Sequence, residues 1–331
     1  NRLTATAGGR YYDYKEERRF TSGGLFSDGN NQFDSTKSNG FNPRLLFAYK
    51  ASDSVTLNAQ AARGFRLGGV NDPLNVPLCT LADRAVFGGY QRFSDESLWN
   101  YEAGMKMQTR GLSFNAATFY TQMKDLQVTL DAGSCSSRVV FNVPKAHSAG
   151  VELEMTLRPA DGLEFGLSGI AVKSVYDSTV VDGAGKVIGG IRDGNRLPSV
   201  PKVQLTASVT YNFSLAGHES YVSASVQQVG SRYTQPSDQE NNPRTFVANL
   251  PFLGAPASAA TTLNLELPSY RIVNLNAGMD FERGLSAIFY INNLTDEKAL
   301  LSFDRERGGR ARLGFATNQP RTIGMTLRKS F

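Results

Sequence analysis

The chain has 331 residues, of which 40% are hydrophobic and 20% are charged, and its formal net charge is +5. Its Lys and Arg residues are scattered and form no recognisable module, which argues against a nucleic-acid-binding protein. No apolar run reaches the roughly 18 residues of a membrane-spanning helix, and the mean hydropathy is −0.29. Such a low hydropathy is compatible with a membrane β-barrel, because every second residue of a barrel strand faces a polar lumen.

The first residues already alternate between polar and apolar side chains, as in a β-strand. Residues 1–6 carry neither the basic region nor the apolar core of a secretory signal peptide. An outer-membrane protein is made with such a peptide, and this chain opens inside a strand. We therefore expect residue 1 not to be the natural start of the protein.

Strands with a period of two recur along the chain. The clearest is 204–213, where Leu205, Val209 and Phe213 take one face and Thr206 and Asn212 take the other. The length of about eight to ten residues fits a tilted membrane-crossing strand, and we count about 12 such strands in all. In chain order, the best defined are 112–121, 151–158, 204–213, 222–229, 272–281 and 323–328.

Short and long connections alternate between these strands. The short ones are 51–53, 108–111, 159–162, 214–218 and 282–284, and the long ones lie near 17–38, 66–96, 131–138, 177–198, 234–267 and 294–318. Outer-membrane barrels have tight periplasmic turns and long extracellular loops. The sequence therefore predicts an all-β fold, an antiparallel transmembrane β-barrel with this arrangement.

The same topology places a group of aromatic residues at the periplasmic strand ends, all on the apolar face. Such a position is typical of the aromatic girdle of a barrel. The group comprises Tyr49, Phe165, Tyr211, Phe213, Phe281 and Phe331.

Six segments carry a family resemblance, and they follow one another in the family's order. The segment 99–106 matches a Y-E-x-G-x-K strand through Tyr101, Glu102, Gly104 and Lys106, and the chain ends on a closing strand with Phe331. The six segments are 62–71, 99–106, 119–127, 142–154, 291–296 and 319–331. Together they resemble the C-terminal barrel of TonB-dependent outer-membrane receptors.

The resemblance implies a function and a domain organisation. It implies an active transporter in the outer membrane of a Gram-negative bacterium, which binds a scarce nutrient such as a ferric siderophore and imports it with TonB-derived energy. Family barrels have about 22 strands and an N-terminal plug. We therefore expect residues 1–331 to be the C-terminal portion of a barrel whose plug and first strands are missing, seen as an open curved sheet with two unpaired edges.

The expected partners follow from the same resemblance: outer-membrane lipid and lipopolysaccharide, a small-molecule ligand, and the TonB complex through the missing N-terminal region. Basic and aromatic residues at the long loops are candidates for capture of an anionic ligand, because guanidinium groups form charge-assisted bonds to anions. Adhesion to lipopolysaccharide phosphates, or simple solubility, would also explain the basic last loop. The ligand candidates are Arg66, Asn71, Tyr90, Arg92, Arg305, Arg307, Arg310 and Arg312.

Two other classes of protein remain open at this stage. One is a soluble β-sandwich that binds or adheres, and the other is a small outer-membrane barrel hydrolase. A hydrolase needs a nucleophile beside a base, yet His147 and His218 lie on different strands, and no arrangement of nucleophile and orienting group is evident around either. The lumen-facing Glu102, Glu152 and Glu154 are expected to line a solvated lumen or to contact a plug. We predict no enzyme activity and no cofactor.

The two cysteines, Cys79 and Cys135, both lie in long connections. No C-x-x-C motif or Cys/His cluster is present, so the sequence predicts no metal site. The extracellular compartment is oxidising, and two cysteines there are expected to pair. The sequence therefore predicts a Cys79–Cys135 disulfide that joins the second and third long loops, with two free thiols as the alternative.

Overall fold

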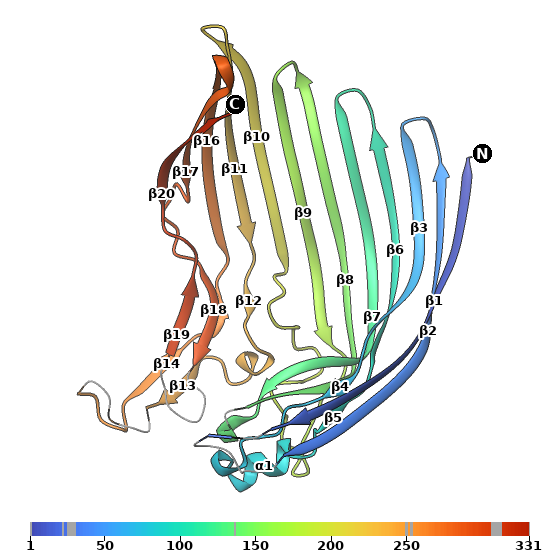
Figure 1. Cartoon of the computed structure of the whole chain (residues 1–331), viewed down its shortest axis with the longest axis vertical. Coiled ribbons are helices and arrows are strands. Elements are labelled where there is room, and N and C mark those ends of the chain that lie inside the picture. The colour runs from blue at the N-terminus through green and yellow to red at the C-terminus, as the bar shows by residue number, and fades with distance from the viewer. Residues whose placement is uncertain are drawn as a thin grey trace.

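The computed structural model describes residues 2–21, 23–24, 31–135, 137–248, 251, 254–305 and 313–330. Its dominant feature is one curved, twelve-stranded sheet in which strands adjacent in the sheet are antiparallel (Figure 1). The sheet consists of β1 (Leu3–Phe20), β2 (Gln32–Lys50), β3 (Val55–Arg66), β6 (Glu96–Gln108), β7 (Leu112–Asp131), β8 (Arg138–Ala160), β9 (Leu163–Tyr176), β10 (Val203–Leu215), β11 (His218–Val229), β16 (Tyr270–Phe281), β17 (Leu285–Asn292) and β20 (Thr322–Lys329).

Smaller elements gather at the lower end of the sheet in Figure 1. Four two-stranded ladders and one α-helix belong to the long connections. The ladders are β4 (Gly69–Val70) with β5 (Arg92–Phe93), β12 (Arg232–Tyr233) with β15 (Glu266–Leu267), β13 (Arg244–Val247) with β14 (Ala260–Leu263), and β18 (Leu300–Arg305) with β19 (Leu313–Thr317); the helix is α1 (Leu81–Phe87). Short 3₁₀ turns occur at Val76–Leu78, Gly133–Cys135, Pro236–Gln239 and Glu282–Gly284.

The predicted fold is confirmed: one antiparallel sheet with the expected number of strands, open at both sides. Among the described residues, β1 pairs only with β2, and β20 pairs only with β17. The sheet is a single layer, because the other sheets in the described part of the chain have only two strands each. This excludes the β-sandwich, since a sandwich needs a second sheet to cover its apolar face.

The five predicted short connections all lie at one end of the sheet (Figure 1). One of the two-residue connections joins β10 to β11 through Ala216 and Gly217, whose φ angles are 52° and 84°. Two consecutive left-handed residues form the turn whose twist matches that of antiparallel strands. This end is the periplasmic end of the topology, and the long connections lie at the opposite, extracellular end.

The first predicted long loop, 17–38, is partly strand, whereas the loop predicted at 131–138 connects β7 to β8 as expected. The β1–β2 ladder continues to the pair Phe20 and Gln32, and the β7–β8 ladder continues to Asp131 and Arg138. Residues 17–20 and 32–38, which we had assigned to the first long loop, belong to β1 and β2. Strand pairing does not require lipid, because the ladder hydrogen bonds satisfy the backbone in water as well. These two hairpins therefore extend beyond the membrane.

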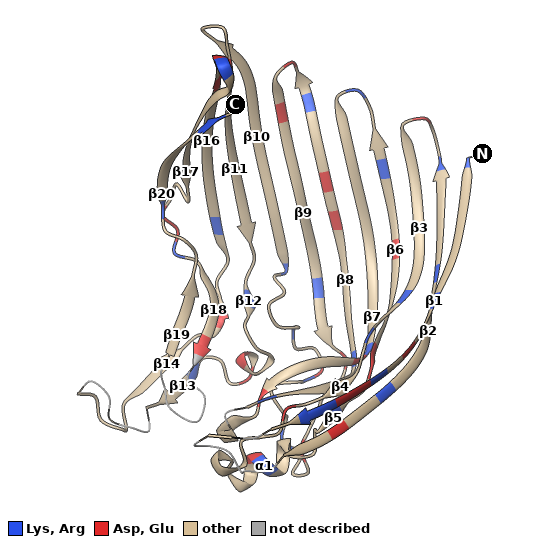
Figure 2. Ribbon diagram, viewed as in Figure 1, with Lys and Arg blue, Asp and Glu red and all other residues tan. Residues whose placement is uncertain are grey.

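The two faces of the sheet differ in polarity as predicted. The apolar face, called the outward face below, carries Leu205, Val222 and Phe289, which remain 39%, 45% and 47% exposed because no protein covers them. The opposite, lumen face carries polar contacts between neighbouring strands: Gln60 donates to Glu102 across 3.0 Å, and Asn115 donates to Glu154 across 3.4 Å. Figure 2 shows few charged residues along the middle of the strands and many in the extracellular hairpins.

The aromatic residues of the predicted periplasmic girdle lie near the short turns. Tyr211 and Phe213 stack with their ring centroids 5.5 Å apart, and Phe331 lies outside the described residues. Within the described part of the chain, no helix has the length and apolar character to cross a membrane.

Candidate functional site

The second long connection, residues 67–95, is an ordered subdomain at the extracellular end. Its helix α1 begins after Thr80, whose hydroxyl oxygen accepts the backbone N–H of Asp83 across 3.2 Å. The Asp83 carboxylate in turn accepts the backbone N–H of Ser134 at 2.9 Å and its hydroxyl at 2.5 Å. These bonds attach the helix to the tip of the β7–β8 hairpin.

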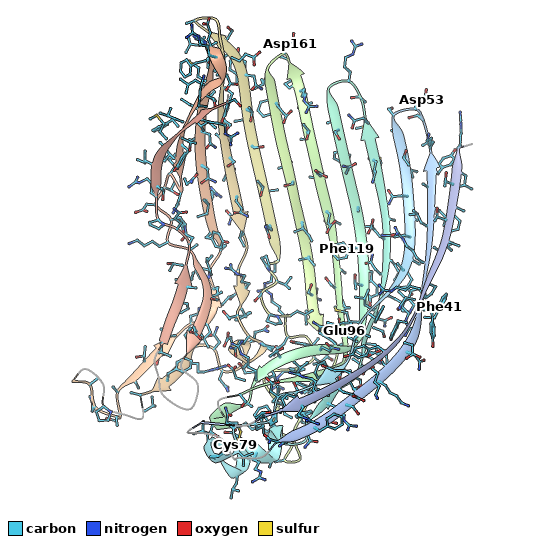
Figure 3. The ribbon with its side chains drawn as sticks, viewed as in Figure 1. Phe41, Asp53, Cys79, Glu96, Phe119 and Asp161 are labelled. Carbon is cyan, nitrogen blue, oxygen red and sulfur yellow. A yellow bond between two sulfur atoms is a disulfide. The ribbon has the colours of Figure 1, made fainter. Side chains whose placement is uncertain are left out.

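A disulfide makes the same attachment covalent. The sulfur atoms of Cys79 and Cys135 are bonded, across a sequence separation of 56 residues. Cys135 is fully buried and packs with Ala132 and Val139 of the hairpin and with Leu74 of the connection. Figure 3 shows Cys79 at the extracellular end of the molecule, on the side opposite Asp53 and Asp161 of the periplasmic turns.

Asn71 joins the second connection to β8 as well. Its side-chain amide donates to the carbonyl oxygens of Tyr90 at 2.8 Å and Val140 at 2.6 Å, and its oxygen accepts the Val140 N–H at 2.9 Å. Asn71 is buried. Its polar atoms therefore serve the backbone rather than a ligand.

Arg66 also makes internal contacts. Its guanidinium lies 2.5 Å from the Glu96 carboxylate and 2.7 Å from the carbonyl oxygen of Gln127. The Gln127 side chain donates back to the carbonyls of Leu67 at 2.8 Å and Ser94 at 3.1 Å. This network fixes the point where β3 leaves the sheet for the second connection.

The β1–β2 hairpin docks on the second connection through polar side chains. Arg18 donates to the carbonyl oxygen of Val70 at 2.5 Å and to Asp72 at 2.9 Å. Further along the hairpin, the Asp34 carboxylate accepts from Nε of Arg92 at 2.7 Å and also pairs with its Nη2. The hydrogen bond from Arg92 lowers the pKa of Asp34 below its ordinary value of 3.8.

Acid should release this hairpin. Because the pKa of Asp34 is lower in the folded than in the unfolded chain, its contribution to docking is complete above the ordinary pKa and is lost as the pH falls through the lowered one. We expect the protection of residues 32–40 against hydrogen exchange, measured relative to the intrinsic rate at each pH, to fall between about pH 5 and about pH 2. Arg92→Gln should give fast exchange already at the upper pH; equal protection in both proteins would contradict the role of the pair.

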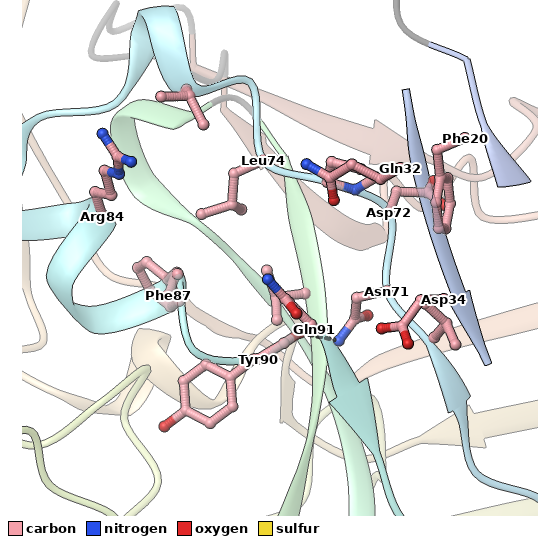
Figure 4. A pocket seen from close by; sticks show the side chains of 15 residues that line it. Phe20, Gln32, Asp34, Asn71, Asp72, Leu74, Arg84, Phe87, Tyr90 and Gln91 are labelled. Carbon is pink, nitrogen blue, oxygen red and sulfur yellow. Dashed lines mark hydrogen bonds between the residues drawn. The ribbon is translucent and has the colours of Figure 1, made fainter. Parts of the chain in front are cut away.

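A cavity of about 390 Å³ lies between this hairpin and the second connection (Figure 4). Figure 4 shows Arg84 and Phe87 on the helical side, with Phe20, Gln32 and Asp72 opposite. Arg84 is exposed, and within the described part of the chain its guanidinium has no partner. The other lining residues are Asp34, Val70, Asn71, Pro73, Leu74, Val76, Gly88, Tyr90, Gln91 and Val139.

The cavity rests on an apolar core at the mouth of the barrel. Tyr90 packs on Phe141 of β8 with ring centroids 5.4 Å apart. Phe141 belongs to a buried cluster with Met123, Tyr176 and Ile191, which come from β7, β9 and the fourth long connection. The cavity wall is therefore held by packing from several parts of the chain, a property that favours a preformed ligand site.

The sequence candidates are distributed unevenly around this cavity. Asn71 and Tyr90 line it, Arg92 holds its wall residue Asp34, and Arg66 lies outside its lining. Arg305 ends β18, where its backbone pairs with Leu313. Arg307, Arg310 and Arg312 lie outside the described residues. Sequence reasoning missed Arg84 and helix α1, although Thr80 and Asp83 have the spacing of a helix cap before an apolar residue.

Among the described residues, one histidine is paired with a carboxylate, although we had expected no orienting group beside either histidine. Nδ1 of His147 lies 2.7 Å from the Asp177 carboxylate, so this histidine does have an orienting partner. His147 lies on the outward face, because along β8 it is on the same side of the strand as Ala149 and the exposed Val151. Among the described residues, no group of three or more His, Cys, Asp or Glu side chains is placed to hold a metal ion.

These features define the chain as part of an outer-membrane β-barrel with an ordered extracellular mouth. The sequence profile described as "TonB dependent receptor-like, beta-barrel" matches residues 1–294. The chain belongs to this family, and its location is the bacterial outer membrane.

Several receptors are similar to this chain in sequence or in structure. The pesticin receptors of Yersinia enterocolitica and Yersinia pestis are each 30% identical over 166 residues, which cover 50% of this chain and 22% of the relative. The ferric yersiniabactin uptake receptor FyuA from Yersinia pestis superimposes with a TM-score of 0.73 at 23% identity, covering 100% of this chain and 43% of the other. The siderophore receptor PiuA from Acinetobacter baumannii gives a TM-score of 0.67 at 16% identity, over 98% of this chain and 40% of the other.

The structural similarities establish the fold. The chain spans 22% of the length of the curated relatives it matches and 43% or less of these two solved structures. Substrate, energy source and partners of the whole protein are therefore taken up as proposals.

Proposed function

We propose that this chain forms the C-terminal portion of a receptor that binds a scarce nutrient outside the cell and imports it. The proposal is supported by the family assignment and by relatives described as receptors for ferric siderophores. Further barrel strands would pair with the open edges of β1 and β20. The family resemblance implies that a plug domain precedes them. Energy would come from the TonB complex acting through that preceding region.

The observation that carries the ligand proposal is the cavity between the β1–β2 hairpin and α1. Phe20, Leu74, Phe87 and Tyr90 offer apolar and aromatic contact area, and Arg84 supplies a cation that has no partner among the described residues. The lining also contains polar residues, and its carboxylates Asp34 and Asp72 are paired with Arg92 and Arg18. Small-molecule sites combine apolar walls with polar groups that fix the ligand. The cavity suits an organic anion with aromatic parts, and a ferric siderophore has this chemistry.

Catalysis is not part of the proposal. His147 faces outward, and the His147–Asp177 pair lies outside the cavity lining. The described residues that line the cavity include no histidine, cysteine or serine that could act as a nucleophile or base beside its carboxylates. A binding site, rather than a hydrolytic one, is the function that this lining supports.

Removing the charge of Arg84 should weaken ligand binding. A hydrogen bond to a charged group contributes about 1.5–3 kcal/mol, so Arg84→Gln should raise the Kd by about 10- to 100-fold. Calorimetric titration of the full-length receptor with a panel of ferric siderophores, beginning with ferric yersiniabactin, measures the effect. Arg110→Gln, in a periplasmic turn, is the matched control and should bind as the unchanged receptor does. A Kd unaffected by Arg84→Gln would exclude this cavity as the anion site.

A further inference from the structure

Basic residues on the outward face follow the apolar series of several strands. From the periplasmic turn, the outward positions of β9 carry Leu163, Phe165, Leu167, Gly169 and Ala171, and the next outward residue is Lys173. The same step occurs on β3, from Ala61 to Arg63, and on β16, from Val273 to Arg271. Because a membrane-crossing strand has about 9–11 residues, each cation lies where its strand leaves the lipid.

Aromatic residues mark the same level independently. Trp99 and Tyr101 on β6 stack with ring centroids 6.1 Å apart, and Tyr101 is directly opposite Tyr120 of β7. All three lie on the outward face, and aromatic side chains of this kind concentrate at the membrane–water boundary. Tyr120 is opposite Ala149, which is opposite Lys173, so this lysine is in register with the aromatic row.

Two more lysines stand just beyond this row. Lys124 of β7 and Lys145 of β8 are directly opposite each other in the ladder. We call Lys124, Lys145 and Lys173 the lysine patch. All three side chains are exposed, and none has an ion-pair or hydrogen-bond partner in the described part of the chain. The acidic residue beside them, Asp177, is bound by His147 at 2.7 Å.

The patch differs from several arginines at this end of the molecule. Arg18, Arg66, Arg92, Arg192 and Arg196 all form ion pairs with carboxylates. Like charges directly opposite in a ladder destabilise the sheet unless a counter-charge is present. An anion from outside the chain, at the level of the lipid head groups, would therefore relieve the repulsion between the opposed Lys124 and Lys145.

We propose that the lysine patch binds the phosphate groups of an anionic lipid of the outer leaflet, whose acyl chains lie on the apolar outward residues of β7, β8 and β9. Ammonium groups bind phosphate as point charges, and exposed lysines at an anionic membrane surface each contribute to binding. Arg63 and Arg271, at the same level on β3 and β16, extend the cationic rim to either side. The partner is thus a phosphorylated lipid, and the proposal rests on membrane placement alone and is independent of nutrient import.

The test uses the full-length receptor, purified in detergent, stripped of lipid and titrated with diphosphoryl lipid A or with the same lipid after removal of its phosphates. A triple variant carries Lys124→Gln, Lys145→Gln and Lys173→Gln. Each lysine contributes about 1 kcal/mol near an anionic surface, so the variant should bind diphosphoryl lipid A on the order of 100-fold more weakly. Wild-type binding should also fall as salt is raised.

The matched control removes the same charge elsewhere, with Lys50→Gln, Lys106→Gln and Lys186→Gln. Lys50 is at a periplasmic strand end, Lys106 is on the lumen face, and Lys186 is in an extracellular loop. This control should bind as the wild type does. Equal binding by the triple variant, or equal affinity of the wild type for the phosphate-free lipid, would overturn the proposal.

Single variants keep the test decisive if the triple variant folds poorly. In lipid-free detergent, Lys145→Gln should melt no lower than the wild type, because it removes repulsion from Lys124. Added diphosphoryl lipid A should raise the melting temperature of the wild type and of Lys145→Arg more than that of Lys145→Gln. An equal increase in all three proteins would count against the lysine patch.

Discussion

Leu275→Arg is expected to disrupt folding of the barrel, whereas Asn276→Arg at the next position is expected to be tolerated. Leu275 is on the outward face near the middle of the membrane span, between Ala224 and Ile291 of the neighbouring strands. Asn276 points to the lumen. An arginine on the lipid face near the bilayer midplane costs about 2–4 kcal/mol, while the watery lumen can accept the same charge.

The two variants lie one position apart on the same strand, so they are matched in depth in the membrane and in the residue introduced. Full-length receptor refolded into lipid vesicles and titrated with urea gives the free energy of unfolding of each. The folded fraction of each variant can be checked by gel electrophoresis, because a folded barrel migrates differently before and after boiling. Equal losses in the two variants would contradict the assignment of outward and lumen faces.

Loss of the Cys79–Cys135 disulfide is expected to loosen the extracellular mouth while the sheet stays folded. The bridge spans 56 residues. A bridge that closes a loop of this length stabilises the folded state by about 4 kcal/mol if the effect is entropic. The loop it closes includes α1 and one wall of the cavity. The paired change Cys79→Ser and Cys135→Ser should therefore accelerate hydrogen exchange in residues 81–87 and weaken ligand binding.

Exchange in β10 and β11 serves as the internal reference, since neither strand contacts the disulfide. Treatment of the unchanged receptor with a reductant should reproduce the effect of the double substitution. If residues 81–87 stay protected after both treatments, the hydrogen bonds of Asp83 and Asn71 alone are enough to hold the mouth together.

The membrane part of the fold was predictable because lipid imposes a local rule. An outward residue must be apolar, so the alternation in 204–213 and 272–281 identifies strand, face and approximate length without reference to any distant residue. The short turns follow from the same rule, since they interrupt the alternation. Outside the lipid, both faces of a strand are polar, and the extensions of β1–β2 and β7–β8 carry no equivalent signal.

The candidate site was less accessible to sequence reasoning, because the partner of each polar residue is distant along the chain. Asn71 bonds to Val140, 69 residues away, and Arg92 bonds to Asp34, 58 residues away. From sequence alone, these residues resembled free ligand-binding groups in a loop. Among the described residues, the group without a partner at the cavity is instead Arg84, on a helix whose sequence signal is the spacing of Thr80 and Asp83.

The β1–β2 hairpin also forms part of the extracellular surface of this protein. A strand of 18 residues extends for about 60 Å, roughly twice the thickness of the hydrocarbon layer. Its outer half presents Lys15 opposite Lys37 and Glu17 opposite Ser35, so neighbouring surface residues come from two distant stretches of sequence. Antibodies raised against the folded protein would recognise both strands together. A serum raised against a linear peptide from either strand would bind mainly the denatured chain.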